Sequence, residues 1–251
     1  MSSLTYTRFE LLRTVRDRQS FMFSLIFPII MYFLLAGPNK NNHNFGGDAT
    51  RHTGLFAPQY YMVGLLAFGA MIAVLSGGAR IAAERTIGWN RQLRLTPLSA
   101  RAYLRTKIVT GYLMAVISIG LLYIAGSVLG VRLPFGSWVH MTFLILVALI
   151  PFAALGIAMG HLLNDTAAGP AMGGGVSLFA FLGGTWFPIT GGGLFVGFCK
   201  ALPSYWLVQA GHIGLGATNP WHAQAWLVIA AWSVACIGLA AWAYRRDTRR
   251  A

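Results

Sequence analysis

Charged residues are scarce in this sequence, and acidic residues are the scarcest of them. Only 10% of the 251 residues are charged, with 6 Asp+Glu in all, whereas 56% are hydrophobic. Soluble domains carry roughly a quarter charged residues, so this chain has too few polar side chains to cover a surface that faces water. The composition therefore predicts a protein whose surface faces lipid.

The sequence also lacks the common motifs of enzymes and metal sites. Its two cysteines, Cys199 and Cys236, form no Cys-x-x-Cys pair, which argues against a zinc site, a haem attachment or a disulfide framework. It has no His-Glu-x-x-His and no Gly-x-Ser-x-Gly, which disfavours an intramembrane hydrolase. The phosphate-binding pattern Gly-x4-Gly-Lys-[Ser/Thr] is absent too, so we expect neither ATP binding nor catalysis by this chain.

Long apolar segments dominate what is present. Six of them approach the roughly 20 residues that a transmembrane helix needs. The first is short and contains Pro28, which a spanning helix tolerates if neighbouring groups satisfy the freed backbone carbonyl. The fold class predicted is all-α integral membrane, with spans at Phe21–Gly37, Gln59–Ala79, Ile108–Gly130, Trp138–Leu163, Pro170–Phe187 and Trp221–Tyr244.

Basic residues indicate the orientation of these spans. The net charge is +13, and 15 of the 19 Lys+Arg lie before the first span, between the second and third, or after the sixth. Because cytoplasmic loops are enriched in Lys and Arg, both termini are predicted to be cytoplasmic. The same distribution accounts for the charge without nucleic acid. A cleaved signal peptide is disfavoured because the basic region before the first span is too long for one.

The few acidic residues bear on the mechanism of transport. Ion-coupled transporters usually need a carboxylate or histidine deep in the membrane. All six acidic residues lie outside the predicted spans or at their cytoplasmic ends: Glu10, Asp17, Asp48, Glu84, Asp165 and Asp247. A secondary, ion-coupled transporter is therefore the less favoured alternative.

Residues 1–20 are predicted to form a helix that lies on the inner membrane surface. Leu4, Leu11 and Val15 share one face of this helix, and Glu10 lies on the far side. An apolar stripe flanked by basic residues is typical of interfacial helices. A simple positively charged anchor is the alternative, and both descriptions can hold together.

Residues 80–107, between the second and third spans, combine high charge with Leu, Ile and Trp. Trp89 and Leu93 form an i, i+4 pair of a short helix, which Pro97 ends because proline cannot continue the hydrogen-bond ladder. Such a helix is suited to receive a movement from a partner protein. A solvated positive loop is an equally good interpretation of the pattern.

Two motifs carry a resemblance to a known family. The run Glu84-Arg85-x-x-Gly88, followed by Leu93-x-Leu95-Thr96-Pro97-Leu98-Ser99, resembles the cytoplasmic loop of ABC type-2 transporter permeases. Gly183-Gly184-Thr-Trp-Phe-Pro188, followed after a gap by Leu202-Pro203, is similar to the segment that closes the fifth span of that family. With the six spans and the internal termini, the resemblance extends over nearly the whole chain.

The resemblance implies one transmembrane domain, residues 1–251, in the bacterial inner membrane. Two such permease subunits, identical or different, would sit among lipids on two separate ATPase subunits that bind ATP and Mg²⁺. Residues 80–107 would be the coupling loop, and residues 188–220 would form short re-entrant helices on the outer side. The residues implied in coupling are Glu84, Arg85, Gly88, Trp89, Arg91, Leu93, Arg94 and Leu95.

The function that the resemblance implies is ATP-driven export of an apolar or amphipathic substrate, such as a drug, lipid, peptide or glycan. The first, second and fifth spans of two subunits would line the exit path. Candidate contacts for the substrate are Phe27, Tyr60, Met62, Phe179 and Phe181. For each of these side chains, packing in the core or against lipid is the competing interpretation.

Overall fold

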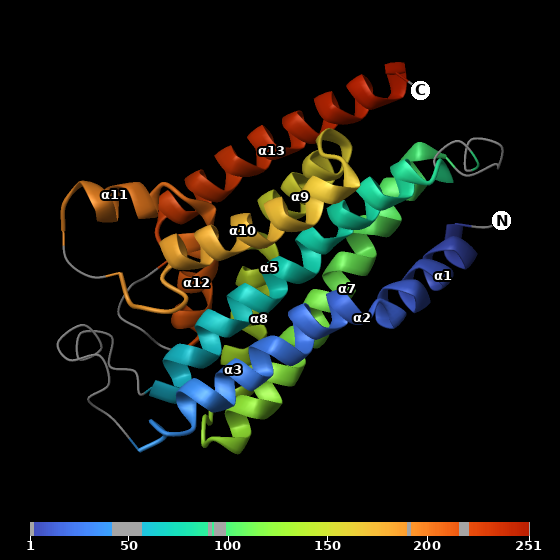
Figure 1. Ribbon diagram of the computed structural model, residues 1–251. Coiled ribbons are helices and arrows are strands. Elements are labelled where there is room, and N and C mark those ends of the chain that lie inside the picture. Colours follow the sequence, from blue (N-terminus) through green and yellow to red (C-terminus); the bar gives the residue numbers. More distant parts are fainter. Residues whose placement is uncertain are drawn as a thin grey trace.

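A computed structural model describes residues 3–41, 57–89, 92, 99–189, 192–215 and 221–250. Every regular element in these residues is helical (Figure 1). The helices are α1 (Ser3–Arg16), α2 (Arg18–Phe21), the π-helix η1 (Met22–Ile26), α3 (Phe27–Ala36), α5 (Ala57–Thr86), α7 (Ala100–Val128), α8 (Phe135–Ala148), α9 (Ile150–Leu162), α10 (Asp165–Gly183), α11 (Leu194–Lys200), α12 (Pro203–Gly214) and α13 (Ala223–Arg250).

Four helical stretches of the described chain are long and apolar enough to cross a membrane. They are Ala57–Thr86, Arg101–Val128, Phe135–Leu162 and Ala223–Asp247, which contain or largely overlap the second, third, fourth and sixth predicted spans. The first predicted span is a shorter apolar helix, Met22–Ala36, and the fifth falls on α10, a helix of 19 residues. The all-helical class is confirmed, and the count of six spans stays a prediction.

The proline of the first apolar segment is accommodated as its sequence predicts. Pro28 has no N–H to donate to the carbonyl of Ser24, four residues earlier. The Ser118 hydroxyl of α7 donates to that carbonyl instead, at 2.8 Å. The backbone widens into the π-helix η1 over the preceding turn, so the apolar helix continues through the proline with its freed carbonyl satisfied.

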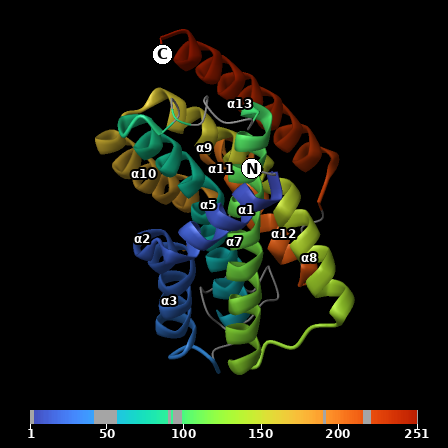
Figure 2. The ribbon, with the colours of Figure 1, turned by 90° about the vertical axis from the view of Figure 1, so that its right-hand side faces the viewer.

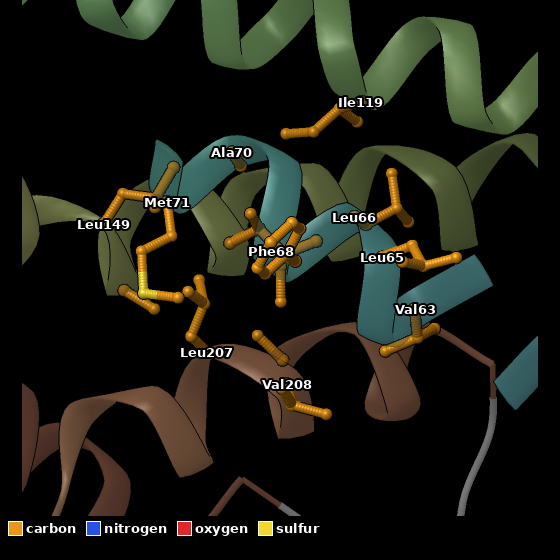
Figure 3. Close-up of a cluster of buried hydrophobic side chains, with 14 of the residues drawn as sticks. Val63, Leu65, Leu66, Phe68, Ala70, Met71, Ile119, Leu149, Leu207 and Val208 are labelled. Carbon is orange, nitrogen blue, oxygen red and sulfur yellow. The ribbon is translucent and has the colours of Figure 1, made fainter. Parts of the chain in front are cut away.

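Helix α5 is the centre of the bundle. It contacts α3, α7, α9, α10 and α12, and 83% of its most apolar window is buried, against 17% for α13 on the periphery. Figure 2 shows α13 and α3 on opposite sides of the molecule. Side chains of α5 form the middle of the core with residues of α7, α12 and the α8–α9 junction (Figure 3), among them Val63, Leu65, Leu66, Phe68, Met71, Ile119, Leu149, Leu207 and Val208.

The ends of the helices divide into two groups. The beginning of α1, the end of α5, the beginning of α7 and the end of α13 lie at one end of the bundle, and α11 lies at the other (Figure 1). Both described chain ends therefore share one side, as the predicted orientation requires. Helix α11 has only 7 residues and α12 has 12, which is too short to span a bilayer.

Helices α5 and α9 approach closely through glycines, as transmembrane helices often do. A Cβ added at Gly78 would overlap the carbonyl oxygen of Gly156, whereas a Cβ at Gly120 of α7 would meet open space. We expect Gly78→Ala to lower the free energy of unfolding by about 1–3 kcal/mol, because the two backbones must separate. Gly120→Ala is expected to leave stability unchanged or slightly higher. Thermal unfolding in detergent checks this, and equal melting temperatures for the two variants would contradict it.

Candidate coupling site at the end of α5

Glu84 and Arg85 occupy the last turn of α5, immediately before the connection to α7. Successive residues of an α-helix project about 100° apart. The two side chains therefore reach different neighbours, and each forms its own set of ion pairs. The sequence predicts a loop from residue 80, but α5 continues to Thr86, because these charged side chains are paired within the protein.

Glu84 joins three helices. Its carboxylate is fully buried and accepts hydrogen bonds from the Arg13 guanidinium of α1 (2.8 Å), the Lys107 ammonium of α7 (2.6 Å) and the Tyr103 hydroxyl of α7 (2.6 Å). Lys107 also donates to the Glu10 carboxylate of α1, at 2.5 Å. We call these five residues the Glu84 cluster. It connects the N-terminal helix to the ends of α5 and α7.

The surroundings of the Glu84 cluster keep its charges in place. A carboxylate taken out of water is stable in its ionised form only if it is paired and hydrogen-bonded, and Glu84 has three donors. Arg80, one turn earlier on α5, is also buried, and its Nε lies 3.9 Å from the nearest Glu10 oxygen. Within the described residues the Arg80 guanidinium makes no hydrogen bond. Its contribution to the cluster is a positive charge close to Glu10.

Trp89, one of the predicted coupling residues, lies beside the N-terminal helix. Burial, together with the negative charges of Glu10 and Glu84, raises the pKa of Tyr6 in α1 above its usual value. The Trp89 side chain lies near the Tyr6 hydroxyl and opposes this shift in pKa, although the hydroxyl makes no hydrogen bond within the described residues. The half-buried indole is thus close to α1, and a displacement of Trp89 would change its contact with that helix.

Arg85 connects α5 to the opposite side of the bundle. Its guanidinium donates to the carbonyls of Gly160 (3.0 Å) and Leu163 (3.1 Å) at the end of α9, where helical carbonyls lack partners of their own. It also pairs with Asp247 of α13 at 2.7 Å. The second oxygen of Asp247 lies 3.0 Å from Nδ1 of His161 in α9. We call Arg85, Asp247 and His161 the Arg85 cluster.

The remaining predicted coupling residues divide between described and undescribed parts of the chain. Gly88 has a φ of +71°, a left-handed conformation that glycine adopts without strain, and it forms the turn after α5. Arg91, Leu93, Arg94 and Leu95 lie outside the described residues. Their place in a docking helix stays a prediction.

The predicted substrate contacts do not share one surface of the single chain. Tyr60 and Met62 of α5 are buried inside the bundle, and the Tyr60 hydroxyl donates to a backbone carbonyl at 2.6 Å. Phe27 and Phe179 are half-buried against the core, whereas Phe181 on α10 is 57% exposed. Their role in a path stays a prediction.

Several residues of the two clusters are not predicted from the sequence. The amphipathic pattern places Glu10 on the side of the first helix away from its apolar stripe, where water would be expected. In the structure this side packs against the bundle, and Tyr6, Glu10 and Thr14, at i, i+4 and i+8, are all buried. Phe9 and Leu12 are the exposed side chains. The four-residue spacing of these polar groups is the signal that could have identified the buried face.

Comparison with known proteins gives the family. Residues 52–242 match the family model described as ABC-2 family transporter protein. The chain is also 28% identical over 187 residues to "Putative transport permease YvfS" of Bacillus subtilis (strain 168), and the alignment covers 71% of each chain. The family match includes the central helix, Glu84, Arg85 and their partners in α7 and α9. The chain therefore belongs to the ABC-2 transporter family, as the motifs after its second apolar segment and at the end of its fifth predict.

Proposed function

We propose that this chain is the permease subunit of an ATP-driven exporter and is moved by separate ATPase subunits. One observation carries the proposal. Two adjacent residues at the end of the central helix are tied to four other helices, Glu84 to α1 and α7 and Arg85 to α9 and α13. A displacement of the segment that follows α5 would therefore reach most of the bundle at once.

This geometry supports the following proposal for coupling. ATP binding would close the pair of ATPase subunits and push on residues 80–107. The end of α5 would move with the push, since Gly88 and Trp89 follow it directly. Because the ion pairs at Glu84 and Arg85 are short and largely buried, the helices that they join would shift together rather than separately.

The proposed path needs a second permease subunit. Helices α3, α5 and α10 correspond to the first, second and fifth apolar segments, and they would line the path between two copies. The glycines Gly169, Gly173, Gly174 and Gly175 of α10 have open space where a Cβ would lie, and small residues let helices of two subunits approach closely. The exposed Phe181 lies on the same helix, as a contact for an apolar or amphipathic substrate.

The test of this function is the source of energy. When the tagged chain is purified from its own membranes, an ATPase with a phosphate-binding loop should co-purify. Vesicles that contain the complex should move the substrate only with hydrolysable ATP, and a protonophore should leave the flux unchanged. Flux by the chain alone that a protonophore abolishes would instead establish a secondary transporter.

The predicted orientation has a direct test by cysteine labelling. Native Cys199 and Cys236 are first replaced by alanine, and single cysteines are then placed at Asn42 or Asn90. Since Asn42 belongs to a predicted external loop and Asn90 to the cytoplasmic one, a membrane-impermeant maleimide should label only the Asn42 variant in intact cells. Both variants should react after permeabilisation. Labelling of the Asn90 variant in intact cells would overturn the orientation.

A further inference from the structure

A groove runs along the outside of the bundle between α7, α9 and α13. Its volume is about 670 Å³, within the roughly 300–1,000 Å³ of small-molecule sites. Apolar side chains form its walls, including Leu104 and Ile108 of α7, Ile157 of α9 and Ile237 and Ala241 of α13. These walls form an apolar surface on which a hydrocarbon chain can bind.

The length of the groove matches one leaflet of a bilayer. On α7 the lining extends from Arg101 to Tyr112, and on α13 from Ile237 to Arg245. At 1.5 Å per residue these stretches are about 16 Å and about 12 Å long. The hydrocarbon core of a bilayer is about 30 Å thick, so the groove reaches about halfway through it from the end that carries both chain termini.

The charge in the groove is confined to that end. Arg101, in the first turn of α7, and Arg245, near the end of α13, are both exposed and both line the groove. Guanidinium groups bind phosphate through paired hydrogen bonds, and basic pockets between transmembrane helices at the cytoplasmic side bind anionic lipid headgroups. The apolar groove therefore matches the acyl chains of a phospholipid, and the two arginines at its end match the phosphodiester.

We propose that this groove is a binding site for an anionic phospholipid of the inner leaflet, held at its phosphate by Arg101 and Arg245. The described lining residues belong to α7, α9 and α13 and none to α3, α5 or α10, and α13 lies on the side of the molecule opposite α3 (Figure 2), so the groove is separate from the proposed path. Its α9 and α13 walls are the helices that Arg85 holds, and Asp247 is two residues from Arg245. A bound lipid would hold the end of α13 against α9 beside this ion pair.

The probe is phosphatidylglycerol, compared with phosphatidylcholine of identical acyl chains. Each is titrated onto the delipidated full-length protein, and bound lipid is counted by native mass spectrometry. Wild-type protein should retain phosphatidylglycerol in preference to phosphatidylcholine. Because each basic residue near a membrane surface contributes about fivefold in affinity for anionic lipid, R101Q/R245Q should bind phosphatidylglycerol about 25-fold more weakly.

A matched variant separates the groove from general charge. R101Q/R246Q removes the same number of charges, but Arg246 lies over the Trp242 ring, 5.3 Å from its centroid, and does not line the groove. It should lose only about fivefold. Equal losses for the two double variants, or equal retention of the two lipids by wild type, would overturn the proposal.

Filling the groove tests its apolar part. Ala241 is an exposed lining residue, so Ala241→Trp should fold normally and occupy the seat of the acyl chain while both arginines remain. Phosphatidylglycerol binding should fall at least tenfold. Unchanged binding by a folded A241W protein would overturn the groove as the site, and loss of a dimer in that variant without loss of lipid would assign the groove to a second copy. Neither readout depends on ATP or transport.

Discussion

Glu84→Gln is expected to lower the free energy of unfolding by about 3 kcal/mol, toward the lower end of the loss seen when buried ion pairs are broken. The variant removes the charge that faces Lys107 and Arg13, and Lys107 is almost completely buried. The loss stays at the lower end because Lys107 keeps the Glu10 carboxylate and because glutamine still has an oxygen that can accept from Tyr103. Unfolding in detergent, followed by circular dichroism or by thermal shift, measures the effect.

A double-mutant cycle identifies the cause of this loss. Lys107→Met alone should also destabilise the protein, since it leaves Glu10 and Glu84 with one positive partner fewer. The combined variant E84Q/K107M should cost clearly less than the sum of the two single variants, because it removes both charges of the pair and so does not leave one of them buried without the other. Strict additivity in the cycle would show that Glu84 and Lys107 do not stabilise each other.

The Trp89→Asp/Leu93→Asp variant is expected to abolish ATP-driven transport while membrane insertion stays intact. The two residues form an i, i+4 apolar pair in the loop that we propose contacts the ATPase. Aromatic and large apolar side chains at the centre of an interface contribute most of its binding energy, and two carboxylates there would have to be buried unpaired. Substrate flux into inverted vesicles in the presence of ATP measures the loss.

Two observations make this result specific. Gln92→Asp, at an exposed position of the same loop, adds a negative charge but leaves the apolar pair, so it should retain most of the transport. Labelling at Asn42 shows whether the double variant is inserted normally. Undiminished transport by a correctly inserted W89D/L93D protein would remove this loop from the coupling route.

The features that could be predicted from the sequence are those that depend on a local pattern of residues. Apolar length identifies α5, α7, the α8–α9 pair and α13, because a bilayer sets the length of a span. The need to satisfy the Ser24 carbonyl opposite Pro28 follows from proline chemistry alone, although its partner, Ser118, does not. The motif at Glu84 and Arg85 coincides with the last turn of α5, where the two ion-pair clusters form, and its role in coupling stays a prediction.

The partners of that motif could not be predicted, because they come from distant parts of the chain. Glu10 and Lys107 are 97 residues apart, and His161 and Asp247 are 86 residues apart. By sequence, Lys107 is one more basic residue that orients the chain, and Glu10 is one more polar residue on an amphipathic helix. Only their contact in three dimensions turns both into buried members of one ion-pair cluster.

The two clusters include residues on both sides of the region that the family model matches. The family match ends at residue 242 and begins at residue 52. Yet Glu10 and Arg13 precede it, Asp247 follows it, and these three carboxylate and guanidinium groups hold the central helix from both sides. A protein trimmed to the matched region would keep the motif but would lose Leu25, Tyr32 and Ala36 from the apolar core. Lys107 would lose one carboxylate, and Arg85 would lose its only carboxylate partner among the described residues. The terminal helices α1 and α13 are therefore structural parts of the bundle. A purification tag should be added beyond these helices and should not replace them.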